Sequence, residues 1–208
     1  REQVTFDRLL VEAMDDCGYQ CENGARGEAN IDKFLAQART AAARCAWGGF
    51  YYSGQVCISV QRIFAHARIA EEFAWRFSAG AQAMRAGHPW EETTEVSSLI
   101  TAAEARRVAG WVAEAVKGGA RQLCGGAAEG SRLAPVVLTG VPDEARVFAQ
   151  EAFGPVAGIN AYTELDEAIE AVNRSDYGLQ AGIFTRDLDR AFYAAGRVEV
   201  GGFLINDV

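Results

Sequence analysis

The sequence predicts an α/β fold of three layers, in which a mainly parallel β-sheet carries helices on both faces. Short apolar runs typical of strands alternate along the chain with helical patterns of ten to sixteen residues. Because parallel strands need a crossover connection, usually a helix, this alternation favours a parallel sheet. Twenty-two glycines against four prolines indicate many tight boundaries between elements.

The first part of the chain is expected to hold two helices. Residues 1–30 form a divergent, polar segment in which an apolar stripe at helical spacing predicts a helix that Gly18 ends. The stripe consists of Phe6, Leu9, Leu10, Ala13 and Met14. The alanine-rich stretch 31–46 predicts a second helix. It begins the main domain, which we expect to cover residues 31–208.

The rest of the main domain alternates strands with helices. A strand is expected near 59–66, followed by an amphipathic helix over 67–87 that Gly87 closes. The next helix, over 102–117, ends at Gly118-Gly119, as a helix C-terminus commonly does. Short strands are expected at 121–126 and 134–141, a short helix or turn at 143–152, further strands at 156–162, 180–185 and 201–207, and helices at 165–175 and 188–198.

Composition and charge exclude several classes of protein. The formal net charge is −8 and the basic residues are scattered singly, which argues against a nucleic-acid partner. No apolar run reaches membrane-spanning length and the first residues lack a signal peptide, so we expect a cytoplasmic protein with no membrane partner. His66 and His88 have no partner at a useful spacing and are expected at the surface.

Five cysteines lie at positions 17, 21, 45, 57 and 124. Cys17 and Cys21 have the spacing C-x3-C, but no second pair and no suitably spaced histidine accompanies them, so no metal site is expected. A disulfide framework is not expected in a chain with this much apolar material. The cysteines are therefore expected to be free thiols, most of them buried.

Cys57 lies in the stretch GGFYYSGQVCISVQR, between an expected helix and an expected strand. Gly54 can adopt dihedral angles closed to other residues, so the turn can bend sharply and present the thiol to a cleft. The Cys57 N–H would then be placed to hydrogen-bond the oxyanion that forms when the sulfur attacks a carbonyl. From the residues alone, Cys57 is either such a nucleophile or a buried structural cysteine.

Two stretches resemble the aldehyde dehydrogenase superfamily. The sequence F-x-x-S-G-Q-V-C, which ends at Cys57 and is followed by Arg62, is similar to the family's catalytic-cysteine motif. Residues 151–207, with E-A-F-G-P-V at the start and G-G-F-L-I-N near the end, resemble the family over their whole length. The spacing between Cys57 and Glu151 also fits. Three motifs in the right order make the resemblance specific, and it covers residues 38–208.

The resemblance implies an enzyme that oxidises an aldehyde to a carboxylic acid with NAD or NADP. Cys57 matches the nucleophile, which forms a thiohemiacetal and, after hydride transfer, a thioester that water hydrolyses. Glu151 matches the glutamate that hydrogen-bonds the nicotinamide ribose, and Phe153 matches an aromatic residue near the nicotinamide. Without the resemblance, Glu151 would be read as a surface carboxylate at a helix end. Asn206 matches a substrate-side asparagine, although a turn-forming role fits it equally.

Other features of the family have no counterpart in the sequence. The family's Rossmann-like cofactor domain and its C-terminal oligomerisation strand are absent from the 208 residues. The general base of the family lies in an E-L-G-G-like motif before the cysteine. Glu22, in C-E-N-G, stands 35 residues before Cys57 but lacks the second glycine. The expected partner is therefore a covalently linked cofactor domain or a second copy of the chain, and the chain alone should have little dehydrogenase activity.

Two other functions fit the same residues. A non-catalytic binding or scaffold remnant would keep Cys57 incidentally, whereas an activated thiol should react with iodoacetamide ahead of the other cysteines. An acylating aldehyde dehydrogenase would resolve the thioester with coenzyme A instead of water, and no residue decides between these acceptors. Esterase activity would need Cys57 and an oxyanion donor but no hydride acceptor.

Overall fold

The computed structural model describes residues 7–11 and 38–208. The strands are β1 (Asp7–Val11), β2 (Val60–His66), β3 (Arg121–Cys124), β4 (Val136–Thr139), β5 (Val156–Tyr162), β6 (Gln180–Phe184) and β7 (Gly202–Ile205). The helices are a helix described over 38–50, the 3-10 turn η1 (Tyr51–Gly54), α2 (Ala70–Ala83), α3 (Ala102–Lys117), α4 (Arg146–Ala149), α5 (Leu165–Asn173) and α6 (Leu188–Ala195). The expected alternation of strands and helices is thus confirmed from residue 38 onwards.

The strands form one seven-stranded sheet in the order β3-β4-β5-β2-β1-β6-β7. Every neighbouring pair is parallel except β3 and β4, which are antiparallel. Helices connect the parallel strands, as this topology requires. The predicted α/β fold with a mainly parallel sheet is therefore confirmed.

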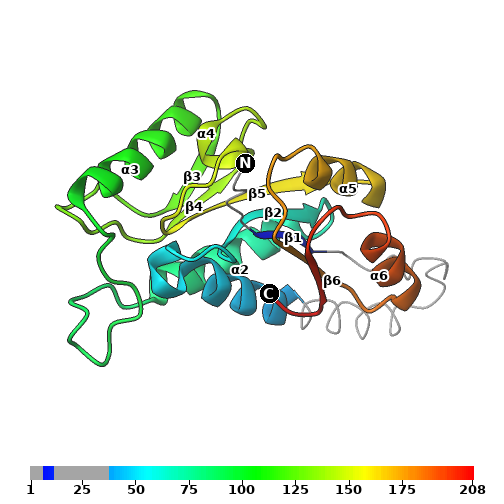
Figure 1. The fold of residues 1–208 in the computed structure, drawn as a ribbon, viewed down its shortest axis with the longest axis horizontal. Helices are drawn as coiled ribbons and strands as arrows, with labels where there is room; N and C mark the ends of the chain where they lie inside the picture. Colours follow the sequence, from blue (N-terminus) through cyan, green and yellow to red (C-terminus); the bar gives the residue numbers. More distant parts are fainter. Residues whose placement is uncertain (1–6, 12–37) are drawn as a thin grey trace, which may run out of the picture.

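Helices cover both faces of the sheet and enclose two apolar cores. Figure 1 shows α3 and α4 on one side of the strands and α2 on the other. Val136 and Leu138 of β4 join the core formed with α3 and α5, whereas Val137 between them joins the core formed with α2 and the helix at 38–50. This alternation is the period of two that a strand buried on both faces imposes. Within the described ranges, none of the helices combines the length and the apolar character that crossing a bilayer requires.

The N-terminal segment departs from the expected helix. Residues 7–11 form strand β1, which pairs in parallel with β2 on one side and with β6 on the other. The gap between two central strands offers ladder hydrogen bonds to the backbone on both sides, and this outweighs a weak local helical pattern. The prediction of a surface position for His66 was also wrong, since its side chain is 6% exposed at the end of β2 and packs edge-on against Tyr162.

The sheet topology decides which loops lie together. Strands β2 and β5 are adjacent and parallel, with Arg62 opposite Gly158. Their amino ends therefore lie at the same edge of the sheet, and the chain that leads into each strand arrives there. Those two segments are residues 51–59, which carry Cys57, and residues 150–155, which carry Glu151 and Phe153.

Candidate active site

The loop that carries Cys57 has an unusual backbone. Tyr52, Ser53 and Gly54 are consecutive left-handed residues, with φ angles of 50°, 57° and 67°. Only glycine adopts this region without steric cost, so two of the three residues are strained. The loop then continues through Gln55 to Cys57, whose side chain is exposed. Among the hydrogen bonds of the described residues, none uses the N–H of Cys57.

Two side chains of the loop bind the segment that precedes α3. The buried hydroxyl of Ser53 donates to the carbonyl of Ser97 (3.1 Å) and accepts from the N–H of the same residue (2.9 Å). The amide of Gln55 accepts from the N–H of Ile100 (2.9 Å) and donates to the carbonyl of Ser98 (3.3 Å). Strained backbone persists only where its surroundings determine it, and these contacts supply that constraint.

The cysteine loop packs directly on the loop that carries Glu151. A Cβ built at Gly54 would lie 2.2 Å from the carbonyl oxygen of Gly154 and 3.0 Å from the nitrogen of Pro155. The two backbones therefore touch at a point where no side chain fits. Gly54 is three residues from Cys57 and Gly154 is three residues from Glu151, so the segments that carry the two candidate residues are in contact.

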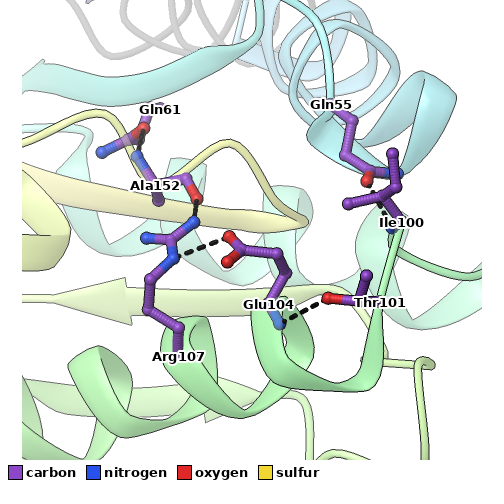
Figure 2. Close-up of polar contacts among 7 residues, drawn as sticks. All are labelled: Gln55, Gln61, Ile100, Thr101, Glu104, Arg107 and Ala152. Atoms are coloured by element: carbon purple, nitrogen blue, oxygen red, sulfur yellow. Dashed lines mark hydrogen bonds and ion pairs between the residues drawn. The ribbon is translucent and has the colours of Figure 1, made fainter.

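The peptide groups on both sides of Glu151 are held by one buried amide. The side chain of Gln61, 4% exposed, donates to the carbonyl of Gln150 (2.7 Å) and accepts from the N–H of Ala152 (2.9 Å). Arg107 of α3 binds the same segment by donating a hydrogen bond to the carbonyl of Ala152 (2.7 Å), as Figure 2 shows. The backbone at Glu151 is thus fixed from β2 and from α3.

The carboxyl group of Glu151 has an unsatisfied atom. Its Oε1 is buried and has no hydrogen-bond partner. Burial raises the pKa of Glu151, and the positive charge of Arg107 opposes that rise. A buried acceptor without a donor is unfavourable, so this oxygen is suited to a hydroxyl group supplied by a ligand.

Replacement of Glu151 by glutamine should change the pH dependence of stability. A carboxyl whose pKa is raised on folding stabilises the fold fully below its unfolded pKa of about 4, and that contribution is lost as pH rises through the folded pKa. The unfolding temperature of Glu151→Gln minus that of the parent should therefore increase from pH 3.5 to pH 7, as measured by circular dichroism.

Glu114→Gln is the control of opposite sign. In the parent, the hydrogen bond with Arg146 lowers the pKa of Glu114. The unfolding temperature of Glu114→Gln minus that of the parent should therefore decrease over the same pH interval. If Glu151→Gln followed Glu114→Gln, burial would not dominate the environment of Glu151.

The other predicted site residues are Phe153, Asn206 and Glu22, of which the structure describes the first two. Phe153 lies in the same loop as Glu151, with φ of 47° and 40% of its surface exposed. Asn206 follows β7 at the carboxyl end of that strand. Its Oδ1 accepts from the N–H of Thr185 (3.0 Å) and its φ is 61°, which fits a turn-forming role. Glu22 lies outside the described residues.

The remaining thiols of the described residues differ from Cys57. Cys45 and Cys124 are free and buried, and burial raises the pKa of both. A buried thiol with a raised pKa is a poor nucleophile near neutral pH. Within the described ranges, no three His, Cys, Asp or Glu side chains are grouped to hold a metal ion. Cys17 and Cys21 lie outside those ranges.

Sequence reasoning missed the residues that hold the two loops, namely Ser53, Gln55, Gln61 and Arg107. For Gln61, the sequence does indicate a buried hydrogen-bonding role. Gln61 and Arg62 are two polar residues at the start of a strand buried on both faces, and buried polar groups need hydrogen-bond partners. That signal does not identify the partner. The hydrogen-bond partners of Gln61 lie 86 to 91 residues further along the chain.

Comparisons with known proteins identify the family of the chain. A model described as the aldehyde dehydrogenase family matches residues 19–208. A 3-sulfolactaldehyde dehydrogenase from Priestia aryabhattai is 44% identical over 172 residues, which are 83% of this chain and 36% of that protein. Aspartate-semialdehyde dehydrogenase 1 from Pseudomonas canavaninivorans is 37% identical over 206 residues, or 99% of this chain and 42% of that protein.

A solved structure shares the fold. The NADP-dependent glyceraldehyde-3-phosphate dehydrogenase from Bacillus halodurans C-125, complexed with NADP, superimposes with a TM-score of 0.82 and 31% identity. The match covers 97% of this chain and 38% of that one. The chain thus spans less than half the length of these three relatives.

Proposed function

Because the chain belongs to the aldehyde dehydrogenase family, we propose that it is the cysteine-bearing part of an NAD(P)-dependent enzyme that oxidises an aldehyde to a carboxylic acid. Cys57 is the nucleophile. One observation carries the proposal: the exposed thiol lies on a left-handed loop whose Gly54 packs against Gly154 in the motif that contains Glu151.

The chemistry at Cys57 begins with addition of its thiolate to the aldehyde carbonyl carbon. The carbonyl oxygen takes the electron pair, and the N–H of Cys57 is the donor that stabilises the resulting oxyanion of the thiohemiacetal. NAD(P), when bound, would accept the hydride that leaves this carbon, and the adduct on Cys57 would then be a thioester. Water then attacks the thioester carbonyl, the carboxylic acid leaves, and the sulfur of Cys57 is restored.

Two residues of this chain suit the cofactor. The buried Oε1 of Glu151 has no hydrogen-bond partner, and a ribose hydroxyl is the kind of donor that it needs. Phe153, partly exposed in the same loop, offers an aromatic surface that keeps water away from the reacting carbon. The general base that activates water is assigned to Glu22, on its distance from Cys57 in the sequence alone.

Protection from alkylation by an aldehyde tests the proposal. Iodoacetamide should modify Cys57 at least about tenfold faster than Cys45 and Cys124, as followed by peptide mass spectrometry at pH 7.5, because a buried thiol is poorly ionised and poorly accessible. Propanal or benzaldehyde should slow the modification of Cys57 by forming the thiohemiacetal, and should do so at lower concentration than is needed to protect glutathione. Alkylation of Cys57 that no aldehyde slows would contradict the proposal.

A further inference from the structure

One short segment of the chain reaches both loops of the site. Residues 97–100 bind the cysteine loop through Ser53 and Gln55, and the helix that follows, α3, carries Arg107 to the loop of Glu151. Figure 2 shows these contacts in sequence, from Gln55 through Ile100, Thr101, Glu104 and Arg107 to Ala152 and Gln61.

The contacts close a circuit around Cys57. The side chain of Gln55 binds the N–H of Ile100, and the hydroxyl of the next residue, Thr101, accepts from the N–H of Glu104 (3.2 Å). The carboxylate of Glu104 accepts from Nε of Arg107 (2.7 Å). A second nitrogen of Arg107 donates to the carbonyl of Ala152, and the N–H of Ala152 donates to Gln61. Gln55 and Gln61 stand on either side of Cys57, so the circuit begins and ends on the cysteine segment.

The charged side chain of Arg107 donates hydrogen bonds to two members of the circuit, the carboxylate of Glu104 and the carbonyl of Ala152. Its guanidinium is oriented by Glu104 and lies 4.5 Å from the ring centre of Trp111, and its charge acts on Glu151. A guanidinium holds several donors in a fixed plane, so it can bind Glu104 and Ala152 at once. Hydrogen bonds from a charged donor contribute more than neutral ones.

We propose that Arg107 is a positioning residue for Cys57, which it holds in register with Glu151 through this circuit. The inference rests on the proposed function, since register matters only if Cys57 attacks a carbonyl. The circuit matters because the loop is strained: the contacts of Ser53 and Gln55 with residues 97–100 hold Tyr52 and Ser53 in the left-handed conformation. Loss of the Arg107 contacts frees the start of α3 from the loop of Glu151. The cysteine segment, which is bound to α3 through Gln55 and to that loop through Gln61, is then no longer held in one position.

The test compares two arginines that contact the same ring. Arg107→Met removes the link, whereas Arg146→Met removes an exposed arginine that also lies over Trp111, at 5.4 Å, but whose side chain pairs with Glu114 and not with either loop. Arg107→Lys keeps the charge but lacks the planar guanidinium that binds Glu104 and Ala152 at once, so it should retain only part of the positioning. The assay uses p-nitrophenyl acetate: the thiolate of Cys57 should attack the ester carbonyl, so that nitrophenolate leaves and an acetyl thioester remains.

We expect Arg107→Met to lower the rate constant of Cys57 acylation about tenfold at an unchanged half-saturating ester concentration, because a misplaced nucleophile loses reactivity without losing binding. Amide hydrogen exchange at Gln55 and Ser59, whose N–H groups bond to Tyr52 and Val56, should quicken about tenfold as well. Arg107→Lys should give intermediate values, and Arg146→Met should match the parent.

The two readouts separate failure of the inference from failure of the proposed function. Equal acylation and equal exchange in Arg107→Met and Arg146→Met would overturn the positioning role. A parent chain that shows no acylation of Cys57 would overturn the proposed function, and the exchange rates would still decide whether Arg107 holds the loop. Unfolding midpoints of the variants show whether an overall loss of stability accounts for the change in exchange, which would also count against the inference.

Discussion

Replacement of Cys57 by alanine should lower the acylation rate with p-nitrophenyl acetate by a factor of at least about 1,000, because the proposed covalent intermediate forms on its sulfur. In the proposed reaction of the parent, the thiolate attacks the ester and the N–H of Cys57 stabilises the oxyanion. Stopped-flow absorbance of nitrophenolate measures the burst. Because Cys57 is exposed at the surface, the variant should unfold at the same temperature as the parent.

Cys124→Ser is the matched control for this result. Cys124 is buried and donates to the carbonyl of Pro135 at 3.5 Å, a contact that a serine hydroxyl can also make. This variant should keep the full burst. A burst that survives in Cys57→Ala, or one that disappears in Cys124→Ser without unfolding, would remove Cys57 from its assigned role.

Replacement of Gly54 by alanine should destabilise the chain by about 3–5 kcal/mol, at the upper end of single substitutions. Part of the cost, about 1–2 kcal/mol, comes from placing a Cβ on a left-handed residue with φ of 67°. The rest comes from the contact at 2.2 Å with the carbonyl oxygen of Gly154, where neither backbone can give way without moving one of the two loops. The acylation burst should fall in the same variant.

Gly140→Ala separates the two parts of that cost. Gly140 has a similar φ of 61°, but a Cβ there meets nothing within 4 Å. In a chain of this size the unfolding midpoint falls by about 2–4 °C per kcal/mol, so Gly140→Ala should lower it by about 4 °C and Gly54→Ala by about 10 °C. Equal shifts in a thermal melt would mean that the cysteine loop does not pack on Gly154 in solution.

The sheet was largely predictable from the sequence, and β1 shows where local patterns fail. From residue 38 onwards, alternation and helical spacing identified the strands and α-helices but not η1, because burial on a known face leaves a period in the sequence. In the N-terminal segment, Leu9 and Leu10 fitted a helical stripe, but residues 7–11 pair with β2 and β6. Which segment fills the gap between two strands is decided by long-range pairing, which no local window contains.

The site was predictable only in part, for a related reason. Cys57 stood out because it follows Gly54 and precedes an expected strand, although a buried structural cysteine fitted the same residues, and Glu151 looked like an ordinary surface carboxylate until the family resemblance was considered. The role of Gln61 and Arg107 depends on acceptors at Gln150 and Ala152, which the fold brings together from distant parts of the chain.

The position of the site in the sheet is a further point that the sequence did not reveal. Ligands of open α/β sheets commonly bind beyond the carboxyl ends of the strands. Here Cys57 and Glu151 lie at the amino ends of β2 and β5, and Asn206 lies at the carboxyl end of β7. The order β5-β2 in the sheet, which cannot be read from the linear order of the strands, makes neighbours of the two loops.

The location of the acyl group after reaction with p-nitrophenyl acetate is the most direct test of the claim that Cys57 is the activated nucleophile. The chain is quenched in acid at the end of the burst, digested and mapped by mass spectrometry. We expect one acetyl group per chain, on Cys57, and its removal by neutral hydroxylamine as a thioester requires. Acetylation spread over lysines and other cysteines, with Cys57 unmodified, would contradict the account.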